Sequence, residues 1–227
     1  MPTAKSLGML EWRKNVSSIA GVRNAVKVKA ALLLTLLAPL LASANALAAD
    51  PIEAKAKICA TCHGDSGVPQ LKTTPVIWGQ NAGYLFYQLR DFKLGSRKND
   101  LMSPISASLD QKDLLPLAEY FAKLKWPNLG QPEAAADVAA KAQAAITSVG
   151  CIGCHLDHFQ GDGTTARVAG QHEDYLQKTM TDFRTGARGN NPGMSDLMKA
   201  TSPDAITALA TYIAGMQIDQ YLEGQGR

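Results

Sequence analysis

Two stretches of this chain share one pattern of cysteine and histidine, Cys59-Ala60-Thr61-Cys62-His63 and Cys151-Ile152-Gly153-Cys154-His155. Each pattern places two thiols one helical turn apart and an imidazole directly after the second thiol. Thiols at this spacing suit thioether bonds to the two vinyl groups of a haem, and the adjacent histidine suits axial ligation of the iron. We therefore predict two covalently bound haem c groups, attached through Cys59, Cys62, Cys151 and Cys154.

Other uses of paired cysteines explain less of the pattern. Four cysteines in an exported protein often form disulfides, and Cys-x-x-Cys also occurs in thioredoxin-type redox sites and in zinc sites. A thioredoxin site needs a βαβ setting, of which the sequence shows no sign. A zinc site built from both pairs would leave the adjacent histidines without a role. Haem attachment accounts for both the paired cysteines and the adjacent histidines.

The residue types available predict the proximal ligands of both irons and the sixth ligand of the first. His63 and His155 directly follow the attachment cysteines, so we predict that they are the proximal ligands. The iron of an electron carrier needs a stable sixth ligand, and methionine sulfur is a soft, neutral donor that raises the reduction potential. Met102 is the only methionine between the two haem patterns, so it is the predicted sixth ligand of the first iron.

The sixth ligand of the second iron has several candidates, namely Met180, Met194, Met198 and Met216. Met194 lies seven residues before Thr201, as Met102 lies seven before Leu109, at the start of the last helix of each half. We predict Met194 on this ground, with Met198 as the alternative. The Pro-Gly pair before Met194 suits a loop that brings the backbone close to haem. Met180 and Met216 are expected to serve in packing.

A proximal histidine usually donates its other ring N–H to a carbonyl, which fixes the ring and raises its basicity. Pro75 is well placed to supply that carbonyl in the first half, and Ala166 stands at the matching position in the second. Gly64, the residue after the first histidine, is replaced by Leu156. We therefore expect the two haems to differ in potential. Of the other histidines, we expect His158 in a loop near the haem edge and His172 exposed to solvent.

The chain is an internal duplication with an offset of 91 or 92 residues. A period of about 90 residues indicates duplicated domains rather than a solenoid. The matching segments are Gly79-Gln80-x3-Tyr84-Leu85 with Gly170-Gln171-x3-Tyr175-Leu176, Phe92-Lys93-x-Gly95-x-Arg97-x-Asn99 with Phe183-Arg184-x-Gly186-x-Arg188-x-Asn190, Met102 with Met194, and Leu117-Ala118-x-Tyr120 with Leu209-Ala210-x-Tyr212.

Each repeat is predicted to be helical, and no convincing alternating strand is present. The expected helices are 51–58 and 82–94 in the first repeat and 133–149 and 173–185 in the second, each repeat ending in one further helix. Asp110 and Ser202 are expected to cap those last helices, the second with Pro203 at its first position. Repeats of about 80–95 residues are marginal on apolar burial alone, so covalently held haem is expected to complete each core.

The predicted domains are residues 49–126 and 133–227, joined by the breaker-rich linker 127–132. Residues 1–48 carry a basic region, an apolar run of 12 residues at 30–41 and small residues ending in Ala48. This is the order of a secretory signal peptide, with cleavage expected after Ala48. An uncleaved anchor is the alternative, although the apolar run is shorter than the ~20 residues of a membrane span.

Without residues 1–48 the charge changes sign. The whole chain has 23 basic and 20 acidic residues, but the predicted mature part has 17 basic and 19 acidic. The apparent basicity therefore gives no argument for nucleic-acid binding. Residues 49–130 carry a formal +2 and residues 131–227 a formal −4. Such a dipole is able to orient docking to a redox partner, although a chance imbalance explains it equally well.

The repeated motifs and the duplicated haem patterns resemble the cytochrome c4 family, the dihaem class I cytochromes of the bacterial periplasm. The similarity covers about residues 51–216, with departures at Leu156 and Ala166. The resemblance implies an all-α fold of two tandem class I cytochrome c domains related by a pseudo-twofold. It also implies two haem c groups and electron transfer in a respiratory chain, with a quinol–cytochrome c oxidoreductase as donor and a terminal oxidase as acceptor.

Three functions are consistent with the sequence. The first is a periplasmic electron shuttle with two His/Met-ligated haems and no substrate chemistry. The second is the dihaem electron-transfer subunit of a dehydrogenase, of the flavocytochrome c type. The third is a dihaem peroxidase, which needs one iron with an open sixth position. Methionines at equivalent positions of both repeats argue against the peroxidase.

Overall fold

The computed structural model of the protein describes residues 51–224, in which all regular secondary structure is helical and no strand occurs. The predicted signal peptide and its cleavage site lie outside the described residues. None of the described helices is long and apolar enough to cross a membrane. The helices of the first repeat are α3 Pro51–His63, α4 Ala82–Leu94, α5 Met102–Ser108, the 3₁₀ turn η1 Gln111–Asp113 and α6 Leu114–Ala122. Those of the second are α7 Ala136–Val149, α8 Ile152–His155, α9 Glu173–Thr185, α10 Pro192–Ala200, α11 Pro203–Ala214 and α12 Asp219–Gly224.

Helices α4 and α9 have the predicted bounds. Both place Leu and Phe at helical spacing toward a core, and both end at a glycine in the left-handed region, Gly95 at φ 78° and Gly186 at φ 81°. Glycine adopts this conformation without the steric penalty that other residues meet, so it stops a helix at a defined residue. The repeated Phe-x-x-Gly motif is therefore a helix C-terminus in both halves.

The remaining helices differ from the predictions at their ends. Helix α3 continues beyond 58 through the whole first haem pattern to His63. Helix α7 begins at Ala136, three residues later than expected, and ends at Val149 as predicted, followed by Gly150 at φ 78°. Helices α5, α8, α10 and α12 were not predicted, because each is short, with 4 to 9 residues. Met194 consequently lies on a helix and not in the expected loop.

The two predicted caps of the last helices have different outcomes. The hydroxyl of Ser202 accepts a hydrogen bond from the N–H of Ala205, and Pro203 occupies the first turn of α11, as predicted. Asp110 precedes the 3₁₀ turn η1 and its side chain makes no capping bond, so this prediction is wrong. The nearby Asp113 is buried and pairs with Lys55 of α3 instead. This ion pair ties the first helix of the repeat to the last.

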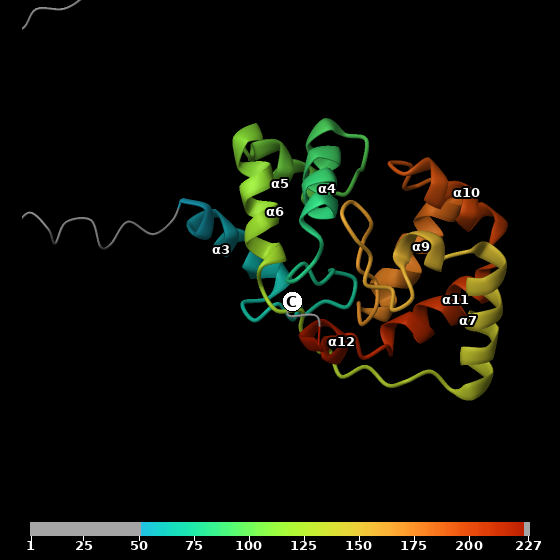
Figure 1. Cartoon of the computed structure of the whole chain (residues 1–227). Coiled ribbons are helices and arrows are strands. Elements are labelled where there is room, and N and C mark those ends of the chain that lie inside the picture. The colour runs from blue at the N-terminus through green and yellow to red at the C-terminus, as the bar shows by residue number, and fades with distance from the viewer. Residues whose placement is uncertain (1–50, 225–227) are drawn as a thin grey trace, which may run out of the picture. The chain divides into compact units, whose positions relative to one another are not determined.

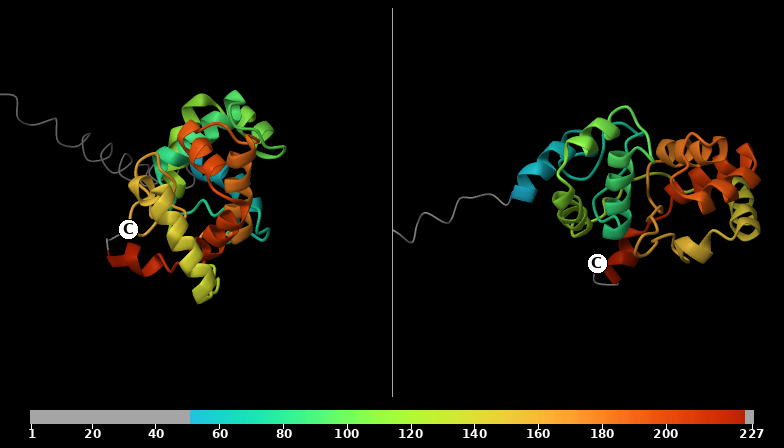
Figure 2. Two further views of the ribbon diagram at one scale, coloured as in Figure 1. Left: turned by 90° about the vertical axis from the view of Figure 1, so that its right-hand side faces the viewer. Right: turned by 90° about the horizontal axis from the view of Figure 1, so that it is seen from above.

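Two hydrophobic cores correspond to the two repeats. In the first, α3, α4 and α6 pack around Leu85, Leu117 and Phe121. In the second, α7 and α9 both pack on α11 around Leu176, Phe183 and a row of residues on α11. Figure 1 and Figure 2 show the helices of each repeat grouped together. The described residues nevertheless form one compact unit.

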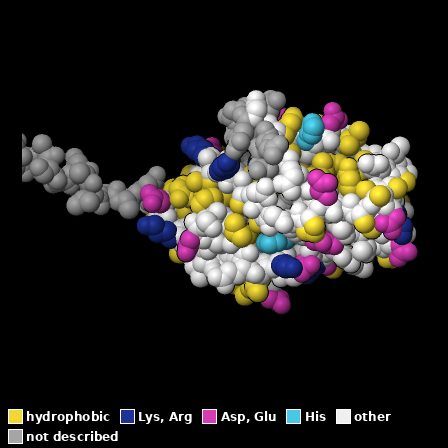
Figure 3. Space-filling model, turned by 90° about the horizontal axis from the view of Figure 1, so that it is seen from below, with side chains coloured by type: hydrophobic (Ala, Val, Ile, Leu, Met, Phe, Trp, Pro, Cys, Tyr) yellow, Lys and Arg dark blue, Asp and Glu magenta, His cyan; other side chains and the backbone are white. Residues whose placement is uncertain are grey.

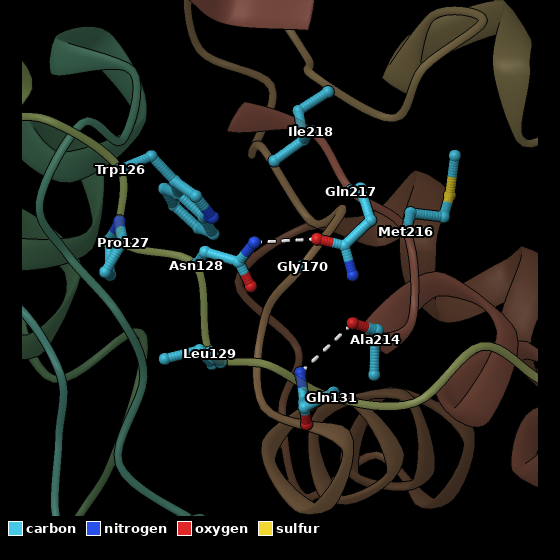
Figure 4. Close-up of a pocket in the computed structure, with 10 residues that line it drawn as sticks. All are labelled: Trp126, Pro127, Asn128, Leu129, Gln131, Gly170, Ala214, Met216, Gln217 and Ile218. Atoms are coloured by element: carbon cyan, nitrogen blue, oxygen red, sulfur yellow. Dashed lines mark hydrogen bonds between the residues drawn. The ribbon is translucent and has the colours of Figure 1, made fainter. Parts of the chain in front are cut away.

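The linker between the repeats is packed against the second one. Trp126, at the end of the first predicted domain, is 2% exposed and belongs to the core of the second repeat. Gln131 donates from its amide to the carbonyls of Gln171 and Ala214, at 2.9 and 3.1 Å. Figure 4 shows the linker running past Gly170 and Ala214, where Trp126 and Gln131 help to line a small pocket. The breaker-rich segment is therefore extended and anchored.

A reciprocal pair of buried glutamines joins the repeats. Gln80 accepts from the backbone N–H of Arg167 at 2.7 Å and donates to its carbonyl at 2.8 Å. Its counterpart Gln171 accepts from the N–H of Val76 at 2.9 Å and donates to its carbonyl at 3.0 Å. Val76 and Arg167 are themselves counterparts, 91 residues apart. The glutamine of each repeat therefore bonds to the same backbone position of the other repeat, as a pseudo-twofold requires.

Candidate functional site

The four cysteines lie at the surfaces of the two repeats. Cys62 and Cys154 are exposed, Cys59 and Cys151 are partly buried, and none forms a disulfide. In the first repeat both thiols stand on α3, one turn apart on one face of a continuous helix. In the second, the helix stops at Gly150 and resumes at Ile152. The cysteines of the first haem pattern thus lie on one continuous helix, whereas those of the second lie in and just after a break between two helices.

The surroundings of the partly buried thiols do not suit redox or zinc chemistry. Burial raises the pKa of Cys59 and of Cys151, so both favour the neutral thiol. A reactive dithiol needs a lowered pKa in an electropositive setting. No group of three or more His, Cys, Asp or Glu side chains suited to a metal ion gathers anywhere in residues 51–224. The two Cys-x-x-Cys pairs therefore do not meet to form a zinc site.

The two histidines of the haem patterns are held in the same way. Nδ1 of His63 lies 2.7 Å from the carbonyl oxygen of Pro75, and Nδ1 of His155 lies 2.9 Å from that of Ala166. A carbonyl oxygen only accepts hydrogen bonds, so Nδ1 carries the proton in both rings. Nε2 then presents a lone pair, which is the form in which imidazole binds a metal. Pro75 and Ala166 thus both lie where the sequence suggested.

Burial keeps these imidazoles neutral. It lowers the pKa of His63 and of His155, and the bonds to the two carbonyls act in the opposite direction without reversing the shift. A neutral imidazole with a fixed tautomer, next to two thiols at helical spacing, fits the axial ligand of a covalently attached haem. Both repeats supply this donor set, so the residues present fit two haem groups.

Met102 and Met194 occupy equivalent positions near helix starts. The N–H of Met102 donates to Oδ1 of Asn99 at 2.9 Å, and the N–H of Met194 donates to Oδ1 of Asn191 at 3.0 Å. The alignment of the two repeats pairs Asn99 with Asn190. In the structure, however, it is Asn191 that makes the hydrogen bond equivalent to that of Asn99. Both methionines are only partly buried. The structure thus gives the two residues the same backbone setting.

The other methionines of the second repeat have packing roles. Met180 is buried on α9 and belongs to the second core, as expected. Met216 packs against that core and is partly buried. Met198, the alternative ligand, is 2% exposed within the core, and its counterpart in the first repeat is the buried Ser106. A thioether at this position is therefore not a shared feature of the two repeats.

The backbone that follows each histidine has the same unusual conformation in both repeats. Gly64 and Gly67 have φ of 87° and 80°, and their counterparts Leu156 and Phe159 have φ of 65° and 53°. Residues other than glycine are strained by about 1–3 kcal/mol at such positive φ, and Leu156, with ψ 173°, lies in a part of this region that is almost restricted to glycine. The second repeat therefore keeps the loop of the first at a cost that glycine avoids. The replacement of Gly64 by Leu156 was noted from the sequence, whereas the replacement of Gly67 by Phe159 was not.

A polar cluster lies between the repeats beside the glutamine pair. Arg97 donates to Tyr175 at 3.2 Å, and its counterpart Arg188 donates to Tyr84 at 3.5 Å. Both guanidiniums also donate to Oε1 of Gln88. Burial opposes ionisation of Tyr175, but Arg97 and Arg188 outweigh it and lower the pKa of this phenol to about 7. The repeated Tyr and Arg of the sequence motifs are thus inter-repeat contacts.

His172 was expected to be exposed, and this prediction is wrong, because the residue is only 8% exposed. It precedes α9 at the position that Asn81 holds in the first repeat. Asn81 donates across the interface to the carbonyls of Gln160 and Thr165. His172 likewise faces the first repeat, at Pro69 and Lys72. His158 is exposed in its loop as expected, and its ring stacks on Tyr221.

The buried position of His172 predicts a pH dependence of stability. Burial lowers its pKa, and Lys72 acts in the same direction, against weaker opposition from the Pro69 carbonyl and Asp174. As the pH falls below the unfolded value of about 6.5, the unfolded chain takes up a proton that the folded chain resists, so stability is lost. His172→Asn, which installs the residue of the first repeat, should reduce this loss. Denaturant unfolding at pH 7.5 and pH 5.5 measures it, and an unchanged difference contradicts the prediction. His158→Asn is the exposed control.

The chain has clear relatives among known proteins, although no protein-family model matches it. A cytochrome c4 of Azotobacter vinelandii is 34% identical over 183 residues, covering 72% of this chain and 87% of that protein. A thiosulfate dehydrogenase electron acceptor of Stutzerimonas stutzeri is 32% identical over 174 residues, covering 71% and 80%. The crystal structure of reduced cytochrome c4 from Pseudomonas stutzeri aligns with a TM-score of 0.65 at 30% identity, covering 74% of this chain and 100% of that one.

Proposed function

This chain belongs to the cytochrome c4 family, and we propose from that premise that it shuttles electrons between membrane complexes of a respiratory chain in the periplasm. It is a dihaem c-type electron carrier and not an enzyme, and it carries two covalently bound haem c groups, as its family does. The observation that carries the proposal is the matched pair of neutral imidazoles. His63 and His155 each follow two cysteines and keep Nε2 available for iron.

The proposed ligands give each haem a closed coordination sphere. Cys59 and Cys62 would hold the first haem and Cys151 and Cys154 the second, with His63 and Met102 as the proposed ligands of the first iron and His155 and Met194 as those of the second. The haems supply the one-electron chemistry when bound. The chain holds the imidazoles in one tautomer, offers neutral sulfur ligands that favour the ferrous state, and leaves no ligand position for substrate.

The proposed domains, 49–126 and 133–227 with the linker 127–132, give each haem its own repeat. Gln80 and Gln171 are buried and bond to the opposite backbone, which supports a fixed separation of the two haems. A fixed separation suits a carrier that accepts an electron at one haem and delivers it from the other. The formal +2 of residues 49–130 against −4 of 131–227 gives the ends different docking surfaces. On the face in Figure 3 the second repeat, on the right, shows mostly acidic charged side chains.

The proposed donor is a quinol–cytochrome c oxidoreductase and the proposed acceptor a terminal oxidase. Service to a dehydrogenase is the alternative, and the Stutzerimonas stutzeri relative that is named a thiosulfate dehydrogenase electron acceptor fits it. Stopped-flow mixing of the reduced protein with oxidase-containing membranes, and of the oxidised protein with a reduced dehydrogenase, separates the two. Fast oxidation by the membranes supports the shuttle, and exclusive reaction with the dehydrogenase supports the alternative.

The absorption spectrum tests the coordination itself. The purified oxidised protein should show low-spin ferric haem at both sites, and a potentiometric titration should resolve two one-electron steps. High-spin ferric haem at either site contradicts the closed coordination that the shuttle requires. This test is independent of the redox partner.

A further inference from the structure

An aromatic ring lies against the loop after the proximal histidine in both repeats, but it comes from different positions. In the first repeat, a Cβ built on Gly67 would lie 2.6 Å from the ring of Trp78, so the indole fills the space beside this glycine. The counterparts of these two residues are Phe159 and Ala169. The glycine has become the aromatic residue, and the aromatic residue has become the small one.

The exchanged pair is in direct contact in the second repeat. The carbonyl oxygen of Phe159 accepts a hydrogen bond from the N–H of Ala169 at 3.2 Å. Phe159 is 3% exposed and Ala169 is fully buried. Because Ala169 is fully buried next to the backbone of Phe159, an indole introduced at 169 would have to displace its neighbours. The two repeats therefore place an aromatic ring at this loop from two different positions.

The ring of Phe159 lies beside the imidazole of His155. Their centroids are 6.4 Å apart and their planes differ by 20°, which is an offset parallel arrangement. On the same loop, the carbonyl of Ala166 accepts the Nδ1 hydrogen bond of His155. The imidazole is thus held at one edge by a carbonyl and bordered by a parallel ring. Phe159 keeps this place despite its backbone at φ 53°.

We propose that Phe159 is the positioning residue of the second haem site, holding the His155 imidazole and shielding its Nδ1 hydrogen bond from water, with Trp78 as its counterpart in the first site. The inference rests on the proposed function, because it takes both histidines as iron ligands. It also accounts for the strained backbone. With alanine at 169, residue 159 supplies the ring that residue 78 supplies in the first repeat.

The test rebuilds the first arrangement in the second repeat. In Phe159→Gly, the Nδ1 proton of the second axial histidine, followed by its hyperfine-shifted NMR signal in the oxidised holoprotein, should exchange with solvent about tenfold faster. Ala169→Trp alone should disturb the site through the clash. Phe159→Gly/Ala169→Trp should restore slow exchange. The signal of the first haem is the internal reference, and Trp78→Ala should affect that signal instead.

Leu156→Gly is the matched control. It removes the other non-glycine residue that has positive φ within residues 51–224, but Leu156 is 37% exposed and has no ring beside His155. Exchange at the second histidine should therefore be unchanged. Unchanged exchange in Phe159→Gly, or a double variant no slower than the single ones, overturns the inference. Loss of His/Met ligation in the unmodified protein would instead refute the proposed function, so the two failures are distinguishable.

Discussion

Met194→Ala is expected to remove about half of the thioether-to-iron charge-transfer absorption of the oxidised protein, and Met102→Ala the other half. Each haem contributes one iron–sulfur bond to this band, so one bond lost leaves one. The same substitutions should lower the potential of the affected haem, because a soft neutral donor that favours ferrous iron is lost. Near-infrared and visible spectra of the holoproteins measure the first effect, and potentiometric titration measures the second.

Met198→Ala provides the control that the second repeat offers. Met198 is 2% exposed in the core, so its truncation should cost about 2–5 kcal/mol of unfolding free energy through the cavity that it leaves. The full charge-transfer band should survive in the folded protein. If Met198→Ala halves the band and Met194→Ala keeps it, the assignment of Met194 is wrong. The buried Ser106 at the equivalent position of the first repeat makes this outcome unexpected.

The parts of the fold that could be predicted are those with a local signal. Helices α4 and α9 combine apolar periodicity with a terminal glycine, so both ends could be placed from the sequence. Helices α5 and α10 have only 7 and 9 residues, and their starts depend on asparagine side chains that accept from backbone N–H groups. The neighbouring Asn190 and Asn191 are indistinguishable as sequence, and only the hydrogen bonds identify the cap.

The contacts between the repeats could not be predicted, because they join residues about 90 positions apart and no local pattern reports them. His172 shows this most clearly. A histidine beside a helix start is ordinarily exposed, but here the other repeat covers it. The signal that was available is the duplication itself. Gln80, Gln171, Arg97 and Arg188 recur at fixed offsets, and a repeated polar residue without a role in its own repeat is a candidate for the interface.

Gln171→Leu and Gln80→Leu are each expected to lower the free energy of unfolding by about 3–9 kcal/mol, since each removes the partner of three backbone groups, at about 1–3 kcal/mol apiece. Gln171 satisfies the N–H and the carbonyl of Val76 and also accepts from the N–H of His172. Gln80 does the same for Arg167 and for the N–H of Asn81. Leucine fills a similar volume but provides none of these bonds. Denaturant unfolding of the holoproteins measures the loss.

The double variant distinguishes an interface from two independent packing sites. If the first substitution already separates the repeats, the second removes bonds that are no longer made, so the double variant should lose less than the sum of the single losses. Gln177→Leu, an exposed change on α9, should stay within about 0.5 kcal/mol of the unmodified protein. Fully additive losses would mean that each glutamine stabilises only its own surroundings, and that something other than this pair fixes the orientation of the two repeats.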